Sequence, residues 1–118
     1  MKIMKVGMIC LLSVFTAACA PQSKYAWGGY ESSLYEHYKA PGDNGVFARN
    51  MSETIAKGES SGRRIPPGLY AEYGNILLEM GDSKQAAVYF QKEKTTWPES
   101  TKLMDTMIRL ASNTKEAK

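Results

Sequence analysis

The sequence predicts an all-helical domain of about five helices that follows an N-terminal export signal. Apolar residues recur at intervals of three and four in successive segments, and Gly, Pro, Asp and Ser residues separate these segments. In addition, no stretch of useful length alternates between apolar and polar residues, as a half-buried strand would. We therefore expect helical hairpins throughout the part of the chain that follows the signal.

The first 18 residues have the composition of a signal peptide. Lys2 and Lys5 give a basic start, residues 6–15 carry no charge, and small residues precede Cys19. The apolar run is shorter than the roughly 20 residues that a membrane-spanning helix needs. Residues 1–18 are therefore predicted to be removed on export.

Cys19 then has no disulfide partner, because Cys10 leaves with the signal. The string "FTAACA" resembles the bacterial lipoprotein signal, although Thr16 stands where that family usually has Leu. The resemblance implies that Cys19 carries acyl chains such as palmitate and becomes the N-terminus. Ala20, in place of Asp, implies the periplasmic face of the outer membrane. The alternative is an ordinary signal peptide that leaves Cys19 free.

Size and charge limit what the mature chain can do. Removal of residues 1–18 from the 118 leaves enough chain for one domain with a modest core. The 15 Lys and Arg exceed the 12 Asp and Glu by three, and the signal contains two of these lysines. This balance excludes the strongly basic face of a nucleic-acid-binding protein. Arg63-Arg64 is interpreted as part of a solvated loop rather than a phosphate site.

The mature chain divides into a tether, residues 19–26, and a helical domain, residues 27–118. The first helix is expected to carry an apolar stripe of Trp27, Tyr30, Leu34 and Tyr38, broadened by Tyr35. Pro41-Gly42 ends it, and Asp43 or Asn44 can cap the second helix. That helix carries Phe47, Met51 and Ile55, and Gly58 fits the left-handed position past its end. Residues 59–64 are expected to form a polar loop.

Ile65-Pro66-Pro67 is expected to open a third helix, since proline is tolerated in a first helical turn. Its apolar face is Leu69, Tyr73, Ile76, Leu77 and Met80, and Gly81 stops it. Asp82 or Ser83 can cap a fourth helix with Ala86, Ala87, Tyr89 and Phe90, which ends at Trp97-Pro98. A fifth helix is expected to place Leu103, Met107 and Leu110 on its inner face.

Residues 67–100 resemble one tetratricopeptide repeat. The matching positions are Tyr70, Tyr73-Gly74, Leu77, Gly81, Ala86, Phe90 and Pro98. Gly74 and Ala86 are small where the two helices are expected to cross closely, whereas Glu93 replaces a small residue. One repeat cannot bury its own face, so the flanking helices must complete the core. The alternative is a helical hairpin that matches the pattern by chance.

The wider string, above all "PPGLYAEYG" and "EKTTWPES", resembles a family of small bacterial lipoproteins of unknown function with such a region. Members of that family are typically encoded beside a lipoprotein resembling the curli secretion channel subunit, together with a second small lipoprotein. The resemblance implies that an envelope lipoprotein of this kind is the protein partner.

The residues give little support for catalysis. No Ser-His-Asp set can be built around His37, which is more simply a partly exposed helix residue. One His and a lipidated Cys do not supply a zinc site, and "PGDNG" is a turn rather than a phosphate loop. We expect a protein that is not an enzyme and uses no cofactor, no metal and no small-molecule substrate.

Binding to protein is the better-supported expectation. Asn75, Leu78 and Glu79 fall off the packing stripe of the third helix and are expected to face a partner. An Asn after the repeat's Gly contacts peptide backbone in peptide-binding relatives, but Ala71 replaces their basic companion residue. A second candidate surface is the aromatic first helix, at Tyr30, Tyr35 and Tyr38, since Tyr is enriched at interfaces.

The sequence thus predicts a lipid-anchored periplasmic adaptor, an accessory subunit of a cell-envelope assembly. The alternative is a non-catalytic activator of a periplasmic peptidoglycan enzyme.

Overall fold

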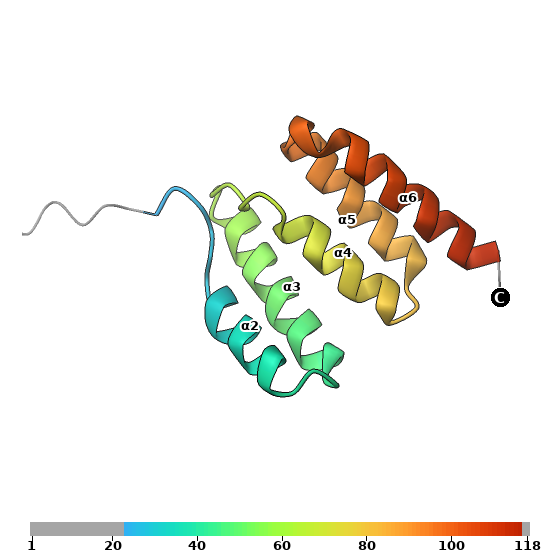
Figure 1. Cartoon of the computed structure of the whole chain (residues 1–118). Coiled ribbons are helices and arrows are strands. Elements are labelled where there is room, and N and C mark those ends of the chain that lie inside the picture. Colours follow the sequence, from blue (N-terminus) through green and yellow to red (C-terminus); the bar gives the residue numbers. More distant parts are fainter. Residues whose placement is uncertain (1–22, 117–118) are drawn as a thin grey trace, which may run out of the picture.

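The computed structural model describes residues 23–116, which form an all-helical fold, as predicted (Figure 1). The helices are α2 (Tyr30–Lys39), α3 (Asn44–Ser60), α4 (Leu69–Glu79), α5 (Ser83–Thr96) and α6 (Thr101–Glu116), with the 3₁₀-helix η2 (Pro98–Ser100) before α6. Successive helices run in opposite directions, so the α3–α4 loop and the α5–α6 connection lie at the same end (Figure 1). The predicted signal peptide and Cys19 lie outside the described residues.

The helix boundaries follow the expected caps. The side chain of Asp43 accepts a hydrogen bond from the Val46 N–H at the start of α3, and Asp82 accepts one from the Gln85 N–H at the start of α5. Gly81, at a φ of 87°, follows α4 in the left-handed region that favours glycine. Local side-chain chemistry therefore fixes both turns.

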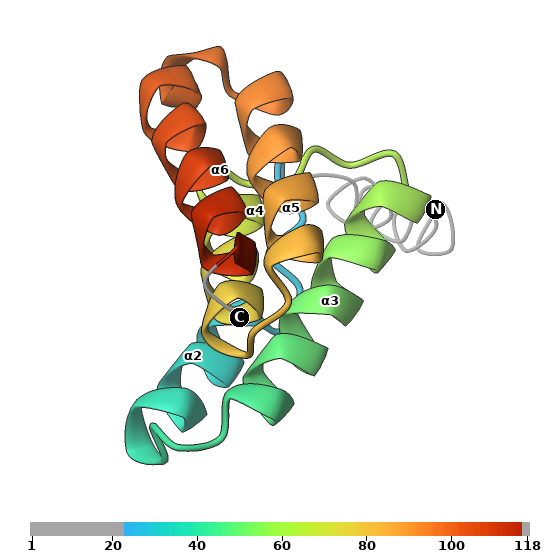
Figure 2. The same ribbon diagram turned by 90° about the vertical axis from the view of Figure 1, so that its right-hand side faces the viewer.

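Two hydrophobic clusters form the core, and α4 contributes to both. Figure 2 shows α5 and α6 side by side, with α4 behind them. The first joins the N-terminal segment to α3 and α4 through Ala26, Phe47, Ala48, Met51, Ile55, Ile65, Leu69, Tyr70 and Ile76. The second joins α5 to α6 through Ala86, Phe90, Met104 and Ala111, with residues of α4 packed against it. Because both clusters lie within residues 26–111, a fragment of residues 21–118 contains the whole core.

Gly74 allows α4 and α5 to approach closely, as its position in the repeat pattern predicts. Phe90, which is fully buried, packs its ring directly against this glycine. A Cβ atom at residue 74 would lie 2.6 Å from Cε1 of Phe90. The glycine is therefore required by packing and not by backbone conformation.

Gly58 does not end the second helix, contrary to the prediction. It lies inside α3, and its missing side chain leaves room for Ala26 and Ile65, whose nearest carbons would lie 2.6 and 2.5 Å from a Cβ atom there. Gly62, at a φ of 66°, occupies the left-handed position instead. The expected polar loop is correspondingly shorter, because α3 continues to Ser60.

The start of the third helix was also predicted wrongly. Pro66 and Pro67 precede a turn, and α4 begins at Leu69 after Gly68, whose φ is 88°. Met80 was expected on the apolar face, but it follows the last helical residue and its side chain is 52% exposed.

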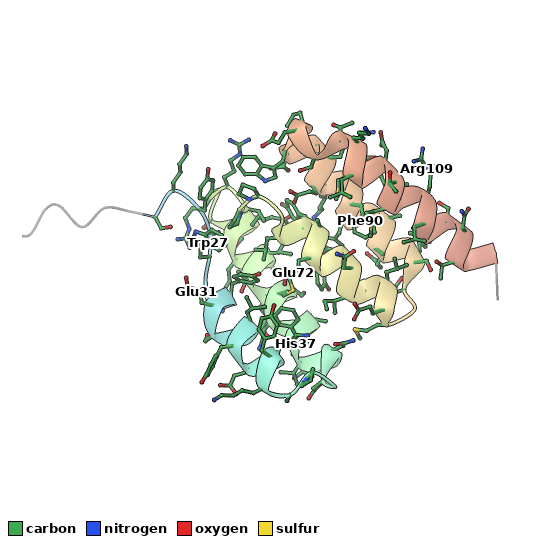
Figure 3. All side chains as sticks on the ribbon, in the orientation of Figure 1. Trp27, Glu31, His37, Glu72, Phe90 and Arg109 are labelled. Carbon is green, nitrogen blue, oxygen red and sulfur yellow. The ribbon has the colours of Figure 1, made fainter. Side chains whose placement is uncertain are left out.

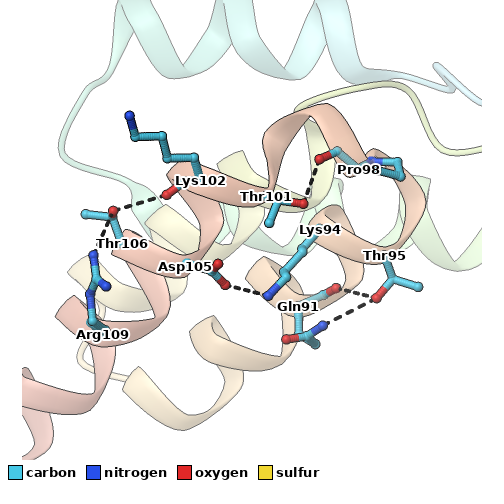
Figure 4. Close-up of polar contacts among 9 residues, drawn as sticks. All are labelled: Gln91, Lys94, Thr95, Pro98, Thr101, Lys102, Asp105, Thr106 and Arg109. Atoms are coloured by element: carbon cyan, nitrogen blue, oxygen red, sulfur yellow. Dashed lines mark hydrogen bonds and ion pairs between the residues drawn. The ribbon is translucent and has the colours of Figure 1, made fainter.

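The predicted inner face of the last helix is correct at Met107, which packs against the second cluster, but wrong by one residue at Leu103 and Leu110. Met104 and Ala111 are buried in the second cluster, whereas Leu103 and Leu110 are exposed. One helical residue is a rotation of about 100°, so a shift of one position turns these leucines away from α5. The ion pair between Lys94 on α5 and Asp105 helps to fix this rotation (Figure 4).

The N-terminal segment belongs to the folded domain, although residues 25 and 26 were assigned to the tether. Ala26 is buried, and its N–H donates to the Arg64 carbonyl at 3.1 Å. Tyr25 pairs with the same residue of the α3–α4 loop in a single parallel bridge. The described chain is therefore fixed to the domain from Tyr25 onward.

Candidate functional site

An open groove lies between the end of α3 and the outer face of α5. We call it the α3–α5 groove; it has a volume of about 540 Å³, and its lining is mainly apolar. Its lining residues are Glu59, Tyr70, Ala87, Val88, Gln91, Lys92, Thr95 and Thr96. Val88 is 47% exposed although it is aliphatic, so the groove presents apolar surface to solvent. Its volume falls within the range of natural ligand pockets.

Three polar side chains converge at one wall of this groove. The Tyr70 hydroxyl and the Lys92 Nζ both donate to Oε1 of Glu59, each at 2.8 Å. Lys92 also lies over the rings of Tyr70 and Tyr89, 5.5 and 5.0 Å from their centroids. This network joins α3, α4 and α5 and holds the amine at the edge of the groove.

The network perturbs the acid–base properties of its members. Burial raises the pKa of Glu59, but the hydrogen bonds from Lys92 and Tyr70 outweigh it and lower the pKa below its usual value. Burial and the hydrogen bond to Glu59 raise the pKa of the Tyr70 hydroxyl. At neutral pH the wall therefore presents the carboxylate of Glu59 and the neutral phenol of Tyr70.

Glu93, next to Lys92 on α5, supports the same region from inside. Glu93 is 1% exposed, and its Oε1 accepts a hydrogen bond from the Gly68 N–H at 2.7 Å, whereas its buried Oε2 has no hydrogen-bond partner among the described residues. Gly68 precedes α4 and has no side chain with which to cap it, so Glu93 supplies the missing acceptor. Burial nevertheless raises the pKa of Glu93.

The residues predicted to bind a partner on α4 do not line the α3–α5 groove. Asn75 and Glu79 are exposed, and Glu79 accepts a hydrogen bond from the Asn44 side chain at 3.1 Å. Leu78 is half-buried and packs against the second cluster. The structure thus leaves Asn75 and Glu79 accessible, whereas Leu78 contributes to the core.

The three tyrosines of the aromatic α2 surface have different environments. Tyr35 and Tyr38 are 60% and 75% exposed and available to a partner. Tyr30 packs against the first cluster, and its hydroxyl donates to Glu72 of α4. His37, rather than Tyr38, faces α3, where it stacks on Phe47 at 4.4 Å between ring centroids (Figure 3).

Sequence reasoning missed Glu59, Lys92 and Glu93 as members of a site. A usable signal for Glu93 was present, since it stands where the repeat pattern expects a small residue. The other two lie 33 residues apart on separate helices, and only the packed fold brings them together.

Within residues 23–116, no group of three or more His, Cys, Asp or Glu side chains is placed to hold a metal ion. None of the helices in this part of the chain has both the length and the apolar character of a membrane span.

Residues 23–116 form a small helical domain whose surface carries an exposed apolar groove. The chain belongs to the family described as a domain of unknown function, DUF4810, whose model matches residues 24–107. This range includes the N-terminal segment and every residue that lines the groove. No curated protein and no solved structure matches the chain.

Proposed function

We propose that this protein is a lipid-anchored adaptor of a cell-envelope assembly, which binds a protein partner in the α3–α5 groove. In this proposal Cys19 is acylated after removal of residues 1–18, and the domain faces the periplasm from the outer membrane. The partner is an envelope lipoprotein resembling the curli secretion channel subunit.

The observation that carries the proposal is the combination of exposed Val88 with the Glu59–Tyr70–Lys92 wall. An apolar groove with a few fixed polar groups can take up an aliphatic or aromatic side chain of a partner and orient the adjoining backbone. Tyr70 and Lys92 are held before binding by hydrogen bonds to Glu59, so little side-chain entropy is lost on association.

The proposal also treats residues 67–100 as a tetratricopeptide-like unit. The contact between Gly74 and Phe90, together with full burial of Ala86, supports this assignment at three of the pattern's positions. Stacks of such units create extended concave surfaces that bind partners.

The test is co-purification of the full chain from membranes in mild detergent, with identification of bound proteins by mass spectrometry. Val88→Asp places a charge in the groove, and Val46→Asp is a matched control because Val46 is similarly exposed, at 44%. We expect an envelope lipoprotein to be recovered with the wild type and with Val46→Asp. Its recovery should fall about tenfold with Val88→Asp, the effect of losing roughly 1.4 kcal/mol at an interface.

Equal recovery with both variants would exclude the α3–α5 groove as the binding surface. Recovery of a peptidoglycan synthase or hydrolase in place of a lipoprotein would instead favour a non-catalytic activator of a cell-wall enzyme.

A further inference from the structure

One end of the domain combines aromatic rings with positive charge. Tyr25 contacts both tryptophans edge-on, with centroid distances of 6.5 Å to Trp27 and 6.0 Å to Trp97. Arg64 lies over the Trp97 ring at 4.0 Å and donates to the Thr96 carbonyl at 3.0 Å. These contacts join the N-terminal segment, the α3–α4 loop and the end of α5 into one rigid surface.

The outer part of this end is exposed and carries three basic side chains. Trp27 is 43% exposed, and Lys24, Arg63 and Arg64 are exposed as well. Two exposed acidic residues border the surface, Glu99 two residues after Trp97 and Glu31, which Figure 3 labels just below Trp27. Figure 3 shows Trp27 on the side where the described chain begins, far from Arg109 on α6.

We propose that the surface formed by Lys24, Tyr25, Trp27, Arg63 and Arg64 is a membrane-facing surface that binds anionic lipid headgroups. Tryptophan and tyrosine favour the interface between a bilayer and water. Lysine and arginine are attracted to anionic lipids over about one Debye length. The proposal rests on acylation of Cys19, which forms part of the proposed function.

The length of the tether supports a lipid surface as the occupant. Tyr25 is held by its pairing with Arg64, and Cys19 precedes it by six residues. Six fully extended residues span about 20 Å at most. A domain anchored through Cys19 therefore cannot move this end far from the headgroups, whatever its orientation.

The experiment uses the fragment of residues 21–118, which contains the whole core but lacks Cys19. Its partition onto vesicles of phosphatidylglycerol and phosphatidylethanolamine is measured by sedimentation at low and high salt. Phosphatidylcholine vesicles serve as the neutral comparison. We expect salt-sensitive binding to the anionic vesicles, together with a blue shift of Trp27 emission in a Trp97→Phe background.

Lys24→Ser/Arg63→Ser should lower the partition coefficient about 25-fold, since each cation near an anionic surface contributes roughly fivefold. Lys84→Ser/Lys102→Ser is the control, because it removes the same charge from exposed positions elsewhere. It should change the partition coefficient much less. An equal loss in both double variants would overturn the proposal, as would no binding to anionic vesicles at low salt or equal binding to phosphatidylcholine. Because the fragment lacks Cys19, its failure to bind says nothing against the adaptor function, which the full-chain capture tests.

Discussion

Replacement of Gly74 by alanine tests the packing between α4 and α5 directly. The added Cβ would lie 2.6, 2.8 and 3.1 Å from three ring carbons of Phe90. Carbon atoms in favourable contact lie about 3.5–4.0 Å apart. Because the Phe90 ring is fully buried, it cannot turn into solvent to relieve these contacts. One of the two helices must therefore shift.

The expected change in the free energy of unfolding is the sum of two opposing effects. Overpacking of a dense core costs about 1–3 kcal/mol, whereas alanine is favoured over glycine within a helix by about 1 kcal/mol. We expect Gly74→Ala to lower the free energy of unfolding by up to about 2 kcal/mol.

Gly45→Ala is the matched control for helix propensity. Gly45 lies in the first turn of α3, where a Cβ would approach only Asp43 Oδ1, at 3.7 Å. This variant should be neutral or more stable than the wild type by up to about 1 kcal/mol. The difference between the two variants isolates the steric cost at Gly74.

The assay is urea unfolding of the 21–118 fragment, followed by circular dichroism. A double-mutant cycle with Phe90→Leu completes the measurement, because a smaller side chain at residue 90 should accommodate the new methyl group. We expect a coupling energy of about 0.5–3 kcal/mol. If Gly74→Ala were as stable as Gly45→Ala, or if the cycle showed no coupling, the proposed close approach would be refuted.

Three further predictions concern stability, measured with the same fragment, and the last also concerns partner capture by the full chain. Glu93→Ala should cost about 1–3 kcal/mol, because it leaves the part-buried Gly68 N–H, just before α4, without its acceptor. Glu93→Gln should cost less, and its stability should not decline as that of the wild type does when the pH rises from about 4.5 through the raised pKa of Glu93. Glu59→Gln should lower the free energy of unfolding by less than about 1 kcal/mol at pH 7, as for exposed ion pairs. This difference from the wild type, measured by urea unfolding, should disappear as the pH falls below the lowered pKa of Glu59. A difference that persists in acid would contradict this prediction. Asn75→Ala/Glu79→Ala should change stability by less than about 0.5 kcal/mol, and loss of partner capture by this double variant in the full chain would move the interface to α4.

The sequence was most informative where a local interaction determines the structure. The Asp43 and Asp82 caps, the left-handed Gly81 and the end of α5 before Pro98 each depend on a few neighbouring residues. Gly74 was also predicted, because the repeat pattern encodes one specific contact between two helices. The secondary structure of segments with such signals can be predicted without knowledge of the tertiary fold.

Errors arose where tertiary packing decides between similar local choices. On α6, the series Leu103, Met107 and Leu110 fits helical spacing about as well as the series Met104, Met107 and Ala111. The contact with α5 selects the second series. Gly58 is likewise a residue type that often ends a helix. Only the packing of Ala26 and Ile65 against it explains why a glycine lies inside α3.

The α3–α5 groove and the membrane-facing surface are neighbours, which bears on the kind of partner the protein can bind. Thr96 lines the groove, and its carbonyl accepts the hydrogen bond from Arg64, a residue of the membrane-facing surface. With Cys19 acylated, an occupant of the groove would therefore lie close to the bilayer. A partner that is itself lipid-anchored would be held at a high effective concentration there, so a small groove could suffice for stable association. Under the proposed anchoring through Cys19, this arrangement favours a membrane-anchored partner over one that diffuses freely.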